Sequence, residues 1–520
     1  MMKQLAPLAA SAAPANFKNM KYDVIIGLEI HAELKTKSKM FCSCNNDSED
    51  KEPNTTVCPI CLGHPGTLPT PNQEAINWTL LTGLAMHCKI NRVSKFDRKN
   101  YFYPDLPKGY QISQYDLPLC YEGYLEIDGD KIEITRIHLE EDTGKSAHLK
   151  DKNYTLLDFN RAGTPLMELV TEPVIKNAAE AKKFCQAYQQ ILRYLKISNA
   201  DMEKGEMRCE ANISLQKPGK WEYRDGLIKP LKRSKLNNKV EVKNINSFRA
   251  VEKAINFEIE RQSAALDKGE EIIAETRGWD ENKSATVSQR VKETSADYRY
   301  FPEPDIPPLK IDEDWLLRLS SELPELPAAK KERFIHEYNF SPDIAEILIA
   351  DKSLADWTEN VISELDAWIE ANGDEEDRQE KRLAKTAGNW ITSELLKHLN
   401  ADNKKISDLK ITAENFAELV SLIYQDKINS SAGQRILEEM YNNGGDPTDI
   451  MKLMGLEQMD NTKEIEAAVK RVISNNPDQA AAYRAGKITL LQFFLGQVMA
   501  ATQGKANPKI AKELLEKLLK

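Results

Sequence analysis

The chain has 520 residues, of which 41% are hydrophobic and 29% charged, and its formal net charge is -10 at pH 7. This length predicts several hydrophobic cores, and the composition is typical of a globular protein. No apolar run approaches the roughly 18 residues that span a bilayer, so no membrane span is predicted. The negative net charge argues against nucleic-acid binding through a large basic surface, and any RNA contact is expected to be local.

The first twenty residues are rich in Ala, Pro and Asn and contain neither an acidic residue nor an arginine. They lack the uninterrupted apolar core of a secretory signal and the arginines of an organellar transit peptide. Residues 1–20 are therefore predicted to be a disordered extension. Eight cysteines without a secretory signal predict reduced thiols and a cytoplasmic protein.

From Tyr22 onward, short alternating segments separated by Gly, Pro, Asn and Asp predict a sheet-rich domain. Within Gly27–Leu34 every second residue is apolar. A strand there places Glu29 and His31 together on the opposite, polar face. For this segment alone, a solvated strand face is a better explanation of the pattern than a functional site.

Four cysteines form two close doublets separated by a polar loop: Cys42, Cys44, Cys58 and Cys61. This spacing is typical of two knuckles that present four thiolates to Zn²⁺. Four protein ligands leave no open coordination position, so the predicted site is structural.

Two later segments add to the Glu29 and His31 pair. In Arg136–Asp142, strand alternation puts His138 and Glu140 on one face, and Glu168 lies within an apolar run. A carboxylate buried in such a run is costly unless it is paired or bound to a metal. Three strands that offer carboxylate and imidazole groups suit a divalent cation such as Mg²⁺, and hence phosphoryl transfer.

Phosphoryl transfer also needs cations on the transferred group. Candidate residues in this sequence are Arg98, Lys99, Lys145 and Arg208. For each one alone, an ordinary surface or ion-pair role is a better explanation than catalysis. Lys145 lies between Gly144 and Ser146, but Leu139 stands where a phosphate-binding P-loop requires its first glycine.

Amphipathic helices are predicted at Gln73–Met86 and Ala178–Leu195. A basic insert, Lys217–Lys239, is predicted to be an exposed excursion between two strands. The proline-rich stretch Phe301–Leu309 marks a domain boundary, after which the pattern is helical, and Asn400–Lys405 is predicted to be a linker.

Taken in order, seven segments resemble the motifs of the B subunits of the tRNA-dependent amidotransferases. They are Tyr22–Leu34, Phe96–Asp105, Lys108–Gln114, His138–Ser146, Asn160–Leu166, Val242–Phe248 and Asp297–Asp305. The resemblance implies an α+β fold. An antiparallel-sheet cradle domain at 21–310, similar to the glutamine synthetase catalytic fold, would precede an all-helical domain at 311–405 and a small helical tail at 406–520.

The activity that the resemblance implies has two steps. ATP phosphorylates the side-chain carboxylate of Asp or Glu attached to tRNA(Asn) or tRNA(Gln), and ammonia then displaces the phosphate. His31, Glu29 and Glu168 would hold Mg²⁺ together with either Glu140 or Glu141. Strand alternation favours Glu140, whereas the family motif favours Glu141, and the sequence leaves both open.

The resemblance also implies partners. A glutaminase is expected to carry a Ser-Ser-Lys arrangement in a Gly/Ser-rich stretch. This sequence has no such arrangement. Ammonia would therefore come from a separate glutaminase, the A subunit, and a small C subunit would complete a heterotrimer. The tail would contact tRNA through Lys487, Lys505 and Lys509.

Two other classes of function are considered. One is a noncatalytic tRNA-binding protein with a structural zinc site, which has no need of acidic groups on its sheet faces. The other is a stand-alone ligase that amidates a small substrate with free ammonia, against which the helical tail argues weakly.

Overall fold

The computed structural model describes residues 21–149, 152–291, 297–373, 381–457, 462–502 and 504–519. The extension expected at residues 1–20 lies outside the described residues. The chain divides into two compact units, Met1–Leu326 and Pro327–Lys520.

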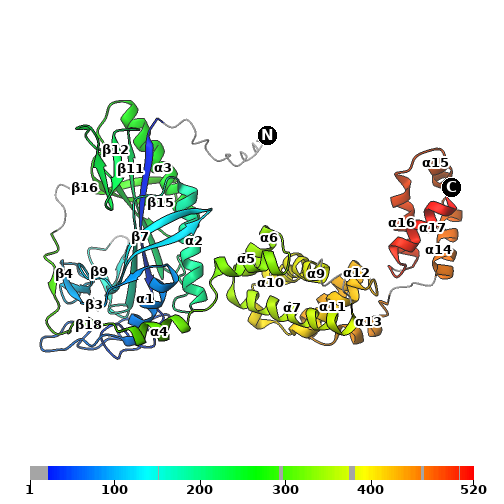
Figure 1. Cartoon of the computed structure of the whole chain (residues 1–520), viewed down its shortest axis with the longest axis horizontal. Helices are drawn as coiled ribbons and strands as arrows, with labels where there is room; N and C mark the ends of the chain where they lie inside the picture. The colour runs from blue at the N-terminus through cyan, green and yellow to red at the C-terminus, as the bar shows by residue number, and fades with distance from the viewer. Residues whose placement is uncertain are drawn as a thin grey trace. The chain divides into compact units, whose positions relative to one another are not determined.

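The first unit is built on a nine-stranded sheet (Figure 1). In spatial order its strands are β16 (Ala285–Val291), β15 (Glu275–Asp280), β14 (Val240–Ile245), β11 (Met207–Gln216), β1 (Asp23–Glu33), β10 (Pro165–Thr171), β7 (Asp130–Glu141), β6 (Cys120–Ile127) and β2 (Lys89–Ile90). Only β14 and β15 pair in parallel, and the other neighbours are antiparallel. The expected mixed fold with a largely antiparallel sheet is confirmed.

Three helices share a hydrophobic core with one face of this sheet. They are α1 (Gln73–Ala85), α2 (Ala178–Tyr194) and α3 (Phe248–Asp267), and they begin where the side chains of Asn72, Asn177 and Ser247 accept hydrogen bonds from the first turn. Leu28 and Ile30 of β1 are buried in the same core. Alternation along β1 therefore turns Glu29 and His31 toward the opposite face.

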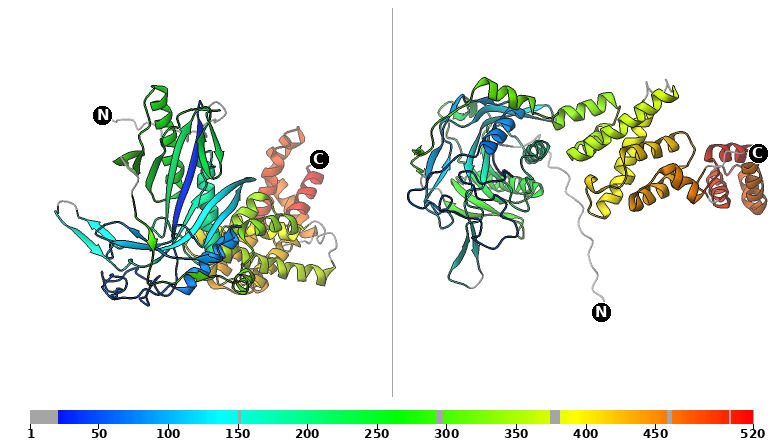
Figure 2. Two further views of the ribbon diagram at one scale, coloured as in Figure 1. Left: turned by 60° about the vertical axis from the view of Figure 1, so that its left-hand side comes forward. Right: turned by 90° about the horizontal axis from the view of Figure 1, so that it is seen from below.

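Short strands form four smaller sheets in this unit. They are β17 (Phe301–Pro302) with β4 (Asp97–Asn100) and β5 (Tyr110–Ser113), β8 (Lys145–His148) with β9 (Thr155–Asp158), β3 (Val93–Ser94) with β18 (Leu309–Lys310), and β12 (Trp221–Arg224) with β13 (Leu227–Pro230). The hairpin of β8 and β9 projects from the body of the unit (Figure 2). The basic insert does lie between two strands, β11 and β14, and it contains the β12–β13 hairpin.

The first unit extends past the boundary expected near residue 310. Helix α4 (Glu313–Ser321) follows, and its Leu316 and Leu319 belong to the core of the sheet domain. The indole Nε1 of Trp315 donates a 2.9 Å hydrogen bond to Asn77 Oδ1 on α1. These contacts join α4 to the sheet domain, so the unit ends at Leu326.

The second unit is helical. Its elements are α5 (Pro327–Glu337), α6 (Pro342–Ile349), α7 (Lys352–Asn372), α9 (Arg382–Trp390), the π-helical turn η2 (Ile391–Leu395), α10 (Leu396–Ala401), the 3₁₀ turn η3 (Ile406–Asp408), α11 (Ala413–Tyr424), α12 (Ser430–Asn443), α13 (Pro447–Met454), α14 (Thr462–Asn475), α15 (Pro477–Arg484), α16 (Leu490–Ala501) and α17 (Pro508–Leu518). Among the described residues, no helix has both the length and the apolarity to cross a bilayer.

Two hydrophobic cores divide this unit. One runs from Phe334 to Leu456, and the other from Ile465 to Leu519. Helix α11 contributes Phe416 to the first core, beside Trp357 of α7 at a ring-centroid distance of 5.2 Å. The cores therefore separate after Leu456, and not at the linker expected at residues 400–405.

Candidate active site

Four adjacent strands place functional side chains in one row across the sheet. The Cα partner of His31 on β1 is Arg208 on β11 on one side and Glu168 on β10 on the other. Glu168 is in turn paired with His138 on β7. Residues far apart in sequence are thus neighbours in this row, and Arg208 also contacts the buried Asp142, 66 positions away.

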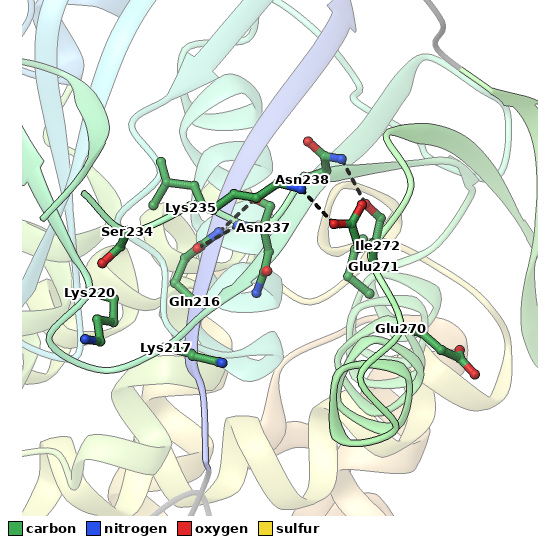
Figure 3. Close-up of a pocket in the computed structure, with 11 residues that line it drawn as sticks. Gln216, Lys217, Lys220, Ser234, Lys235, Asn237, Asn238, Glu270, Glu271 and Ile272 are labelled. Atoms are coloured by element: carbon green, nitrogen blue, oxygen red, sulfur yellow. Dashed lines mark hydrogen bonds and ion pairs between the residues drawn. The ribbon is translucent and has the colours of Figure 1, made fainter. Parts of the chain in front are cut away.

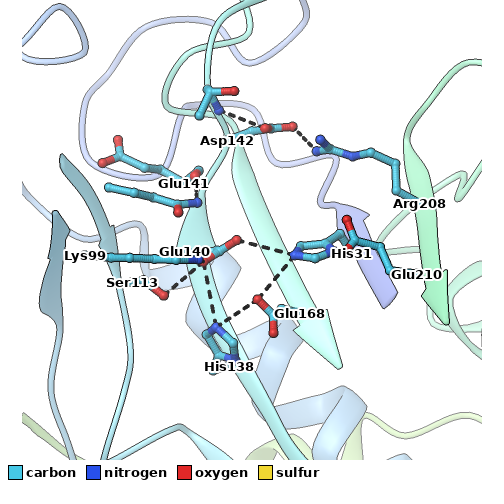
Figure 4. Close-up of polar contacts among 12 residues, drawn as sticks. His31, Lys99, Ser113, His138, Glu140, Glu141, Asp142, Glu168, Arg208 and Glu210 are labelled. Carbon is cyan, nitrogen blue, oxygen red and sulfur yellow. Dashed lines mark hydrogen bonds and ion pairs between the residues drawn. The ribbon is translucent and has the colours of Figure 1, made fainter. Parts of the chain in front are cut away.

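Glu168 of this row and the nearby Glu140 each lie close to both imidazoles, His31 and His138 (Figure 4). His31 Nε2 lies 3.2 Å from Glu168 Oε2 and 3.8 Å from Glu140 Oε1. His138 Nε2 lies 3.4 Å from Glu168 Oε2 and 3.8 Å from Glu140 Oε2. Both carboxylates are buried. We call these four residues the acid–imidazole cluster.

The charged groups of the cluster shift one another's pKa values. Burial alone would raise the pKa of Glu168, but His138 and His31 hold it well below its usual range. Burial would lower the pKa of His31, yet Glu168 and Glu140 raise it to about 9. The buried carboxylates therefore require positive charge beside them, which a divalent cation can also supply.

The donor atoms fit such a cation. Glu29, His31 and Glu168 each offer a ligand atom within 4.8 Å of the others, and so do His138, Glu140 and Glu168. Three carboxylates and two imidazoles make a donor set suited to a divalent metal.

Glu140 and Glu141 are on opposite faces of β7. Glu140 joins the cluster and also accepts a 2.9 Å hydrogen bond from Ser113 Oγ. Glu141 is paired with Lys108, and its Oε1 accepts a 3.0 Å hydrogen bond from the backbone N–H of Ile112. The structure therefore brings Glu140, and not Glu141, to the cluster, as strand alternation predicted.

Lys99 is the cation nearest Glu140 among the predicted residues. Its Nζ lies 4.0 Å from Glu140 Oε2 and 5.3 Å from the ring centroid of Tyr298. Burial would lower the pKa of Lys99, but Glu140 and Tyr300 raise it above its usual value. Lys99 is therefore a permanent positive charge at the edge of the cluster.

Arg98 and Lys145 do not join the cluster. Arg98 lies on the opposite face of β4 from Lys99, and its guanidinium donates to both oxygens of the buried Glu303, at 2.7 and 2.9 Å. It also lies over the ring of Tyr110, 4.3 Å from the centroid. Lys145 is exposed on the β8–β9 hairpin. The expectation that both lie at the reacting group is not met, because Arg98 faces away from Lys99 on β4 and Lys145 is exposed on the β8–β9 hairpin.

Arg208 marks the far end of the row. It pairs with Asp142 and lies 3.9 Å from Glu33 Oε1. Burial would raise the pKa of Asp142, but Arg208 and Arg161 together lower it to about 2. Burial and Asp142 raise the pKa of Glu33 to about 8. Arg208 therefore neutralises a second acidic pair beside His31.

Sequence reasoning missed a third acidic group on this face. Glu29, Glu210 and Glu241 offer ligand atoms within 4.8 Å of one another. Lys243 Nζ lies 2.6 Å from Glu210 Oε2 and 3.7 Å from Glu241 Oε1. Glu210 is two residues from Arg208, so alternation along β11 was a signal that could have found it.

The four predicted zinc ligands are gathered in space. Cys42, Cys44, Cys58 and Cys61 offer sulfur atoms that all lie within 4.8 Å of one another. The Sγ atoms of Cys58 and Cys61 are 3.8 Å apart, close to the edge of about 3.8 Å of a tetrahedron with Zn–S bonds of about 2.3 Å. A hydrogen bond from Cys42 lowers the pKa of Cys61 to about 5. The set fits a closed thiolate site.

Replacing Cys42 and Cys58 together by Ser is expected to release Zn²⁺ and to lower the melting temperature, because two of four thiolates are removed. Metal analysis of the purified protein and thermal unfolding would measure both. Replacing two other buried cysteines, Cys120 and Cys185, by Ser is the control for removal of thiols alone. Full zinc content in the Cys42 and Cys58 variant would contradict the site.

The predicted tRNA-contacting lysines belong to the last helices of the second unit, around the core that runs from Ile465 to Leu519. Lys487 and Lys509 are exposed, and Lys505 is half-buried. Lys509 Nζ is 3.1 Å from Asp426 Oδ2. Lys509 therefore already has an acidic partner at the surface.

A cavity of about 360 Å³ lies beside the basic insert (Figure 3). Its lining mixes lysines of the insert, such as Lys217 and Lys220, with Glu270 and Glu271. Lys235 Nζ is 2.7 Å from Glu271 Oε1. Among the described residues that line this cavity, none belongs to the acid–imidazole cluster.

Comparison with known proteins identifies the family. Residues 24–317 match the model of the GatB/GatE catalytic domain, and residues 375–519 match a GatB domain. The B subunit of the aspartyl/glutamyl-tRNA(Asn/Gln) amidotransferase of Thermotoga neapolitana is 44% identical over 508 residues, which are 96% of this chain and 99% of the relative. The B subunit of the same amidotransferase from Thermodesulfovibrio yellowstonii is 45% identical over 505 residues, 96% of this chain and 100% of the relative. The chain belongs to the family of aspartyl/glutamyl-tRNA(Asn/Gln) amidotransferase B subunits.

Proposed function

We propose that this chain converts Asp-tRNA(Asn), Glu-tRNA(Gln) or both to the amide, with ATP as the source of activation. The observation that supports this most is the acid–imidazole cluster, in which Glu140 and Glu168 are buried beside two imidazoles and the Lys99 ammonium. The names of the relatives point to the same reaction.

The chemistry starts from a poor electrophile, a carboxylate. One of its oxygens attacks the γ-phosphorus of ATP, the bond to the β-phosphate oxygen breaks, and an acyl phosphate and ADP form. The nitrogen of ammonia then attacks the acyl carbon, inorganic phosphate leaves, and the nitrogen loses a proton. Phosphorylation therefore supplies the leaving group that amidation needs.

The residues in and beside the row would have different roles in these two steps. A divalent cation, when bound by Glu29, His31, Glu140 and Glu168, would neutralise the phosphate oxygens. Lys99 adds a fixed positive charge for the transferred phosphoryl group, because its side chain lies against Glu140. Arg208 offsets Asp142 and Glu33, so that these acids do not repel the incoming phosphates.

The proposal includes the parts that the family resemblance implies. The sheet would be a cradle similar to the glutamine synthetase catalytic fold, and the Cys42 to Cys61 set would hold structural Zn²⁺. Ammonia would come from the glutaminase, the A subunit, and a small C subunit would complete a cytoplasmic heterotrimer.

The test is ATP cleavage by the chain assembled with its glutaminase partner. Cleavage is expected with misacylated tRNA and not with uncharged tRNA, because only the former carries the carboxylate. A noncatalytic tRNA-binding protein would bind both and cleave ATP with neither. Cleavage that is indifferent to the attached amino acid would refute the proposal.

Removing residues 462–520 is expected to weaken tRNA affinity at least about tenfold, since this segment includes the three proposed contact lysines. The first core of the second unit ends at Leu456 and should remain folded. Glutamine hydrolysis by the assembled partner should survive. Filter binding and glutaminase assays would measure these outcomes.

Replacing Lys487, Lys505 and Lys509 by Ala is expected to flatten the salt dependence of tRNA binding, by about one in slope for each phosphate that is no longer neutralised. The matched control replaces three ion-paired lysines of the first unit, Lys89, Lys131 and Lys176. If tRNA affinity fell with salt concentration equally steeply in the two triple variants, Lys487, Lys505 and Lys509 would not contact tRNA phosphates.

A further inference from the structure

Two lysines are buried among the residues that the structure describes, Lys39 and Lys330. The Lys330 ammonium has two carboxylate partners, Asp356 Oδ1 at 3.1 Å and Glu359 Oε2 at 2.6 Å. Lys39 is 0% exposed, yet within the described part of the chain it forms no ion pair with a carboxylate. A buried charge is costly unless an opposite charge compensates it. Lys39 therefore needs a source of negative charge other than Asp and Glu.

The ammonium of Lys39 is held by two backbone carbonyls. Its Nζ donates 2.8 Å hydrogen bonds to Thr56 O and to Ala162 O. The backbone N–H of Lys39 donates a further hydrogen bond, of 3.0 Å, to Cys44 O. Carbonyl oxygens satisfy the hydrogen-bonding capacity of an ammonium, but they carry no net charge to balance it. The position of Lys39 is thus fixed, and its charge is left uncompensated by these bonds.

Both cysteine doublets lie next to Lys39. Cys44 accepts the hydrogen bond from its backbone, and its side chain is bonded to Thr56, two residues before Cys58. On the other side, a β-carbon added at Gly163 would lie 3.4 Å from Cys61 Cβ and 3.5 Å from Lys39 Cδ, so both side chains contact the same glycine. Zn²⁺ brings two positive charges to four thiolates, so the loaded site would be negatively charged. That site would be the missing source of negative charge.

We propose that Lys39 is the countercharge of the four-cysteine site and strengthens its hold on Zn²⁺. The inference rests on the structural zinc that belongs to the proposed function. Groups just outside the ligands of a metal tune its affinity, because they set the charge and the geometry of the ligands. Lys39 is a positioning residue in this sense, since it acts through the cysteines and has no contact with the acid–imidazole cluster among its hydrogen bonds.

The same ammonium ties the zinc site to the turn that leads into β10. Ala162, its acceptor, is followed by Gly163, whose O accepts a 2.7 Å hydrogen bond from the N–H of Met40. The N–H of Gly163 donates a 2.9 Å hydrogen bond to Asp142 O, and the Asp142 carboxylate pairs with Arg208. Loss of the ammonium is therefore expected to loosen this turn and, through it, the backbone of Asp142.

The test measures the zinc affinity of the full-length chain by competition with a chromophoric chelator. Lys39→Gln removes the charge but keeps hydrogen-bond donors, and it is expected to weaken zinc binding about 10- to 100-fold. Lys39→Met, which removes charge and donors, should weaken it at least as much, whereas Lys39→Arg keeps the charge and should bind zinc more tightly than either. Lys330→Met is the matched control: it removes a buried lysine whose partners are carboxylates, and it should leave zinc affinity unchanged.

Thermal unfolding with and without a zinc chelator provides a second readout. With zinc bound, Lys39→Gln should melt at a lower temperature than the wild type, and chelation should shrink that difference, because the coupling between the charge and the metal is reciprocal. Lys330→Met should lower the melting temperature equally in both conditions. Amide hydrogen exchange at Gly163 and Asp142 is expected to be faster in Lys39→Gln, and unchanged exchange there would refute the link to the turn before β10.

Zinc affinity that is the same in Lys39→Gln as in the wild type would overturn the inference and leave Lys39 a packing residue. If neither uncharged variant folds, Lys39→Arg decides: tight zinc binding supports the countercharge, and failure to fold overturns it in favour of a requirement for shape alone. A wild-type chain that binds no zinc would refute the zinc site of the proposed function, which is a different result from zinc retained by Lys39→Gln. Neither result depends on the ATP-cleavage assay.

Discussion

Replacing His31 by Ala is expected to abolish ATP cleavage that depends on misacylated tRNA, by about a thousandfold or more. His31 lies between Glu168 and Glu140, at 3.2 and 3.8 Å. Its absence removes one proposed metal ligand and one source of positive charge beside two buried carboxylates. The side chain lies on the polar face of β1, away from the helix-covered core, so the fold should survive.

The measurements are single-turnover phosphorylation of the tRNA-bound carboxylate, zinc content, tRNA affinity and thermal unfolding. The first is expected to change by far the most, because a group needed in the transition state affects the rate more than the ground-state measurements. The melting temperature should fall only slightly, since His138 and Lys99 remain beside the buried carboxylates. Raised Mg²⁺ is expected to restore part of the rate. His148→Ala is the matched control, since His148 is exposed and its Nδ1 contacts Thr155 Oγ1 at 2.9 Å. A normal phosphorylation rate in the His31→Ala variant would show that His31 is not an active-site residue.

Strand alternation accounts for what the sequence predicted about this site. It placed Glu29 with His31, and His138 with Glu140, on the correct faces, because the period of two is a local property of a strand. The burial of Glu168 followed from the apolar residues around it. The cysteine doublets were equally informative, since the ligands of a knuckle are close together in sequence.

Long-range pairing accounts for what the sequence did not predict. The position of β1 between β10 and β11 brings Glu210 beside Glu29, and nothing within Gly27–Leu34 specifies those neighbours. Arg98 is another example: its partner Glu303 is 205 residues away in sequence, so a basic residue next to Lys99 looked like a second catalytic cation. The late division of the helical unit after Leu456 likewise depends on which helices share a core.

Glu140→Gln and Glu141→Gln are expected to have opposite effects, although the two residues are adjacent. Glu140→Gln should lower the rate of tRNA-dependent ATP cleavage at least about a hundredfold, because an amide neither carries the charge that a divalent cation needs nor balances Lys99. Its stability should change little, since the amide oxygen can still accept the hydrogen bond from Ser113.

Glu141→Gln should instead lower stability by about 1–3 kcal/mol while leaving most of the rate intact. Glu141 is buried on the other face of β7, where it pairs with Lys108 and accepts a hydrogen bond from the N–H of Ile112. Breaking that pair leaves the Lys108 ammonium, whose side chain is 7% exposed, without its carboxylate. Chemical denaturation and ATP-cleavage assays on both variants would measure the contrast. If Glu141→Gln lost the rate and Glu140→Gln kept it, the metal-binding face of β7 would be the opposite one, and the acid–imidazole cluster would be a structural charge network.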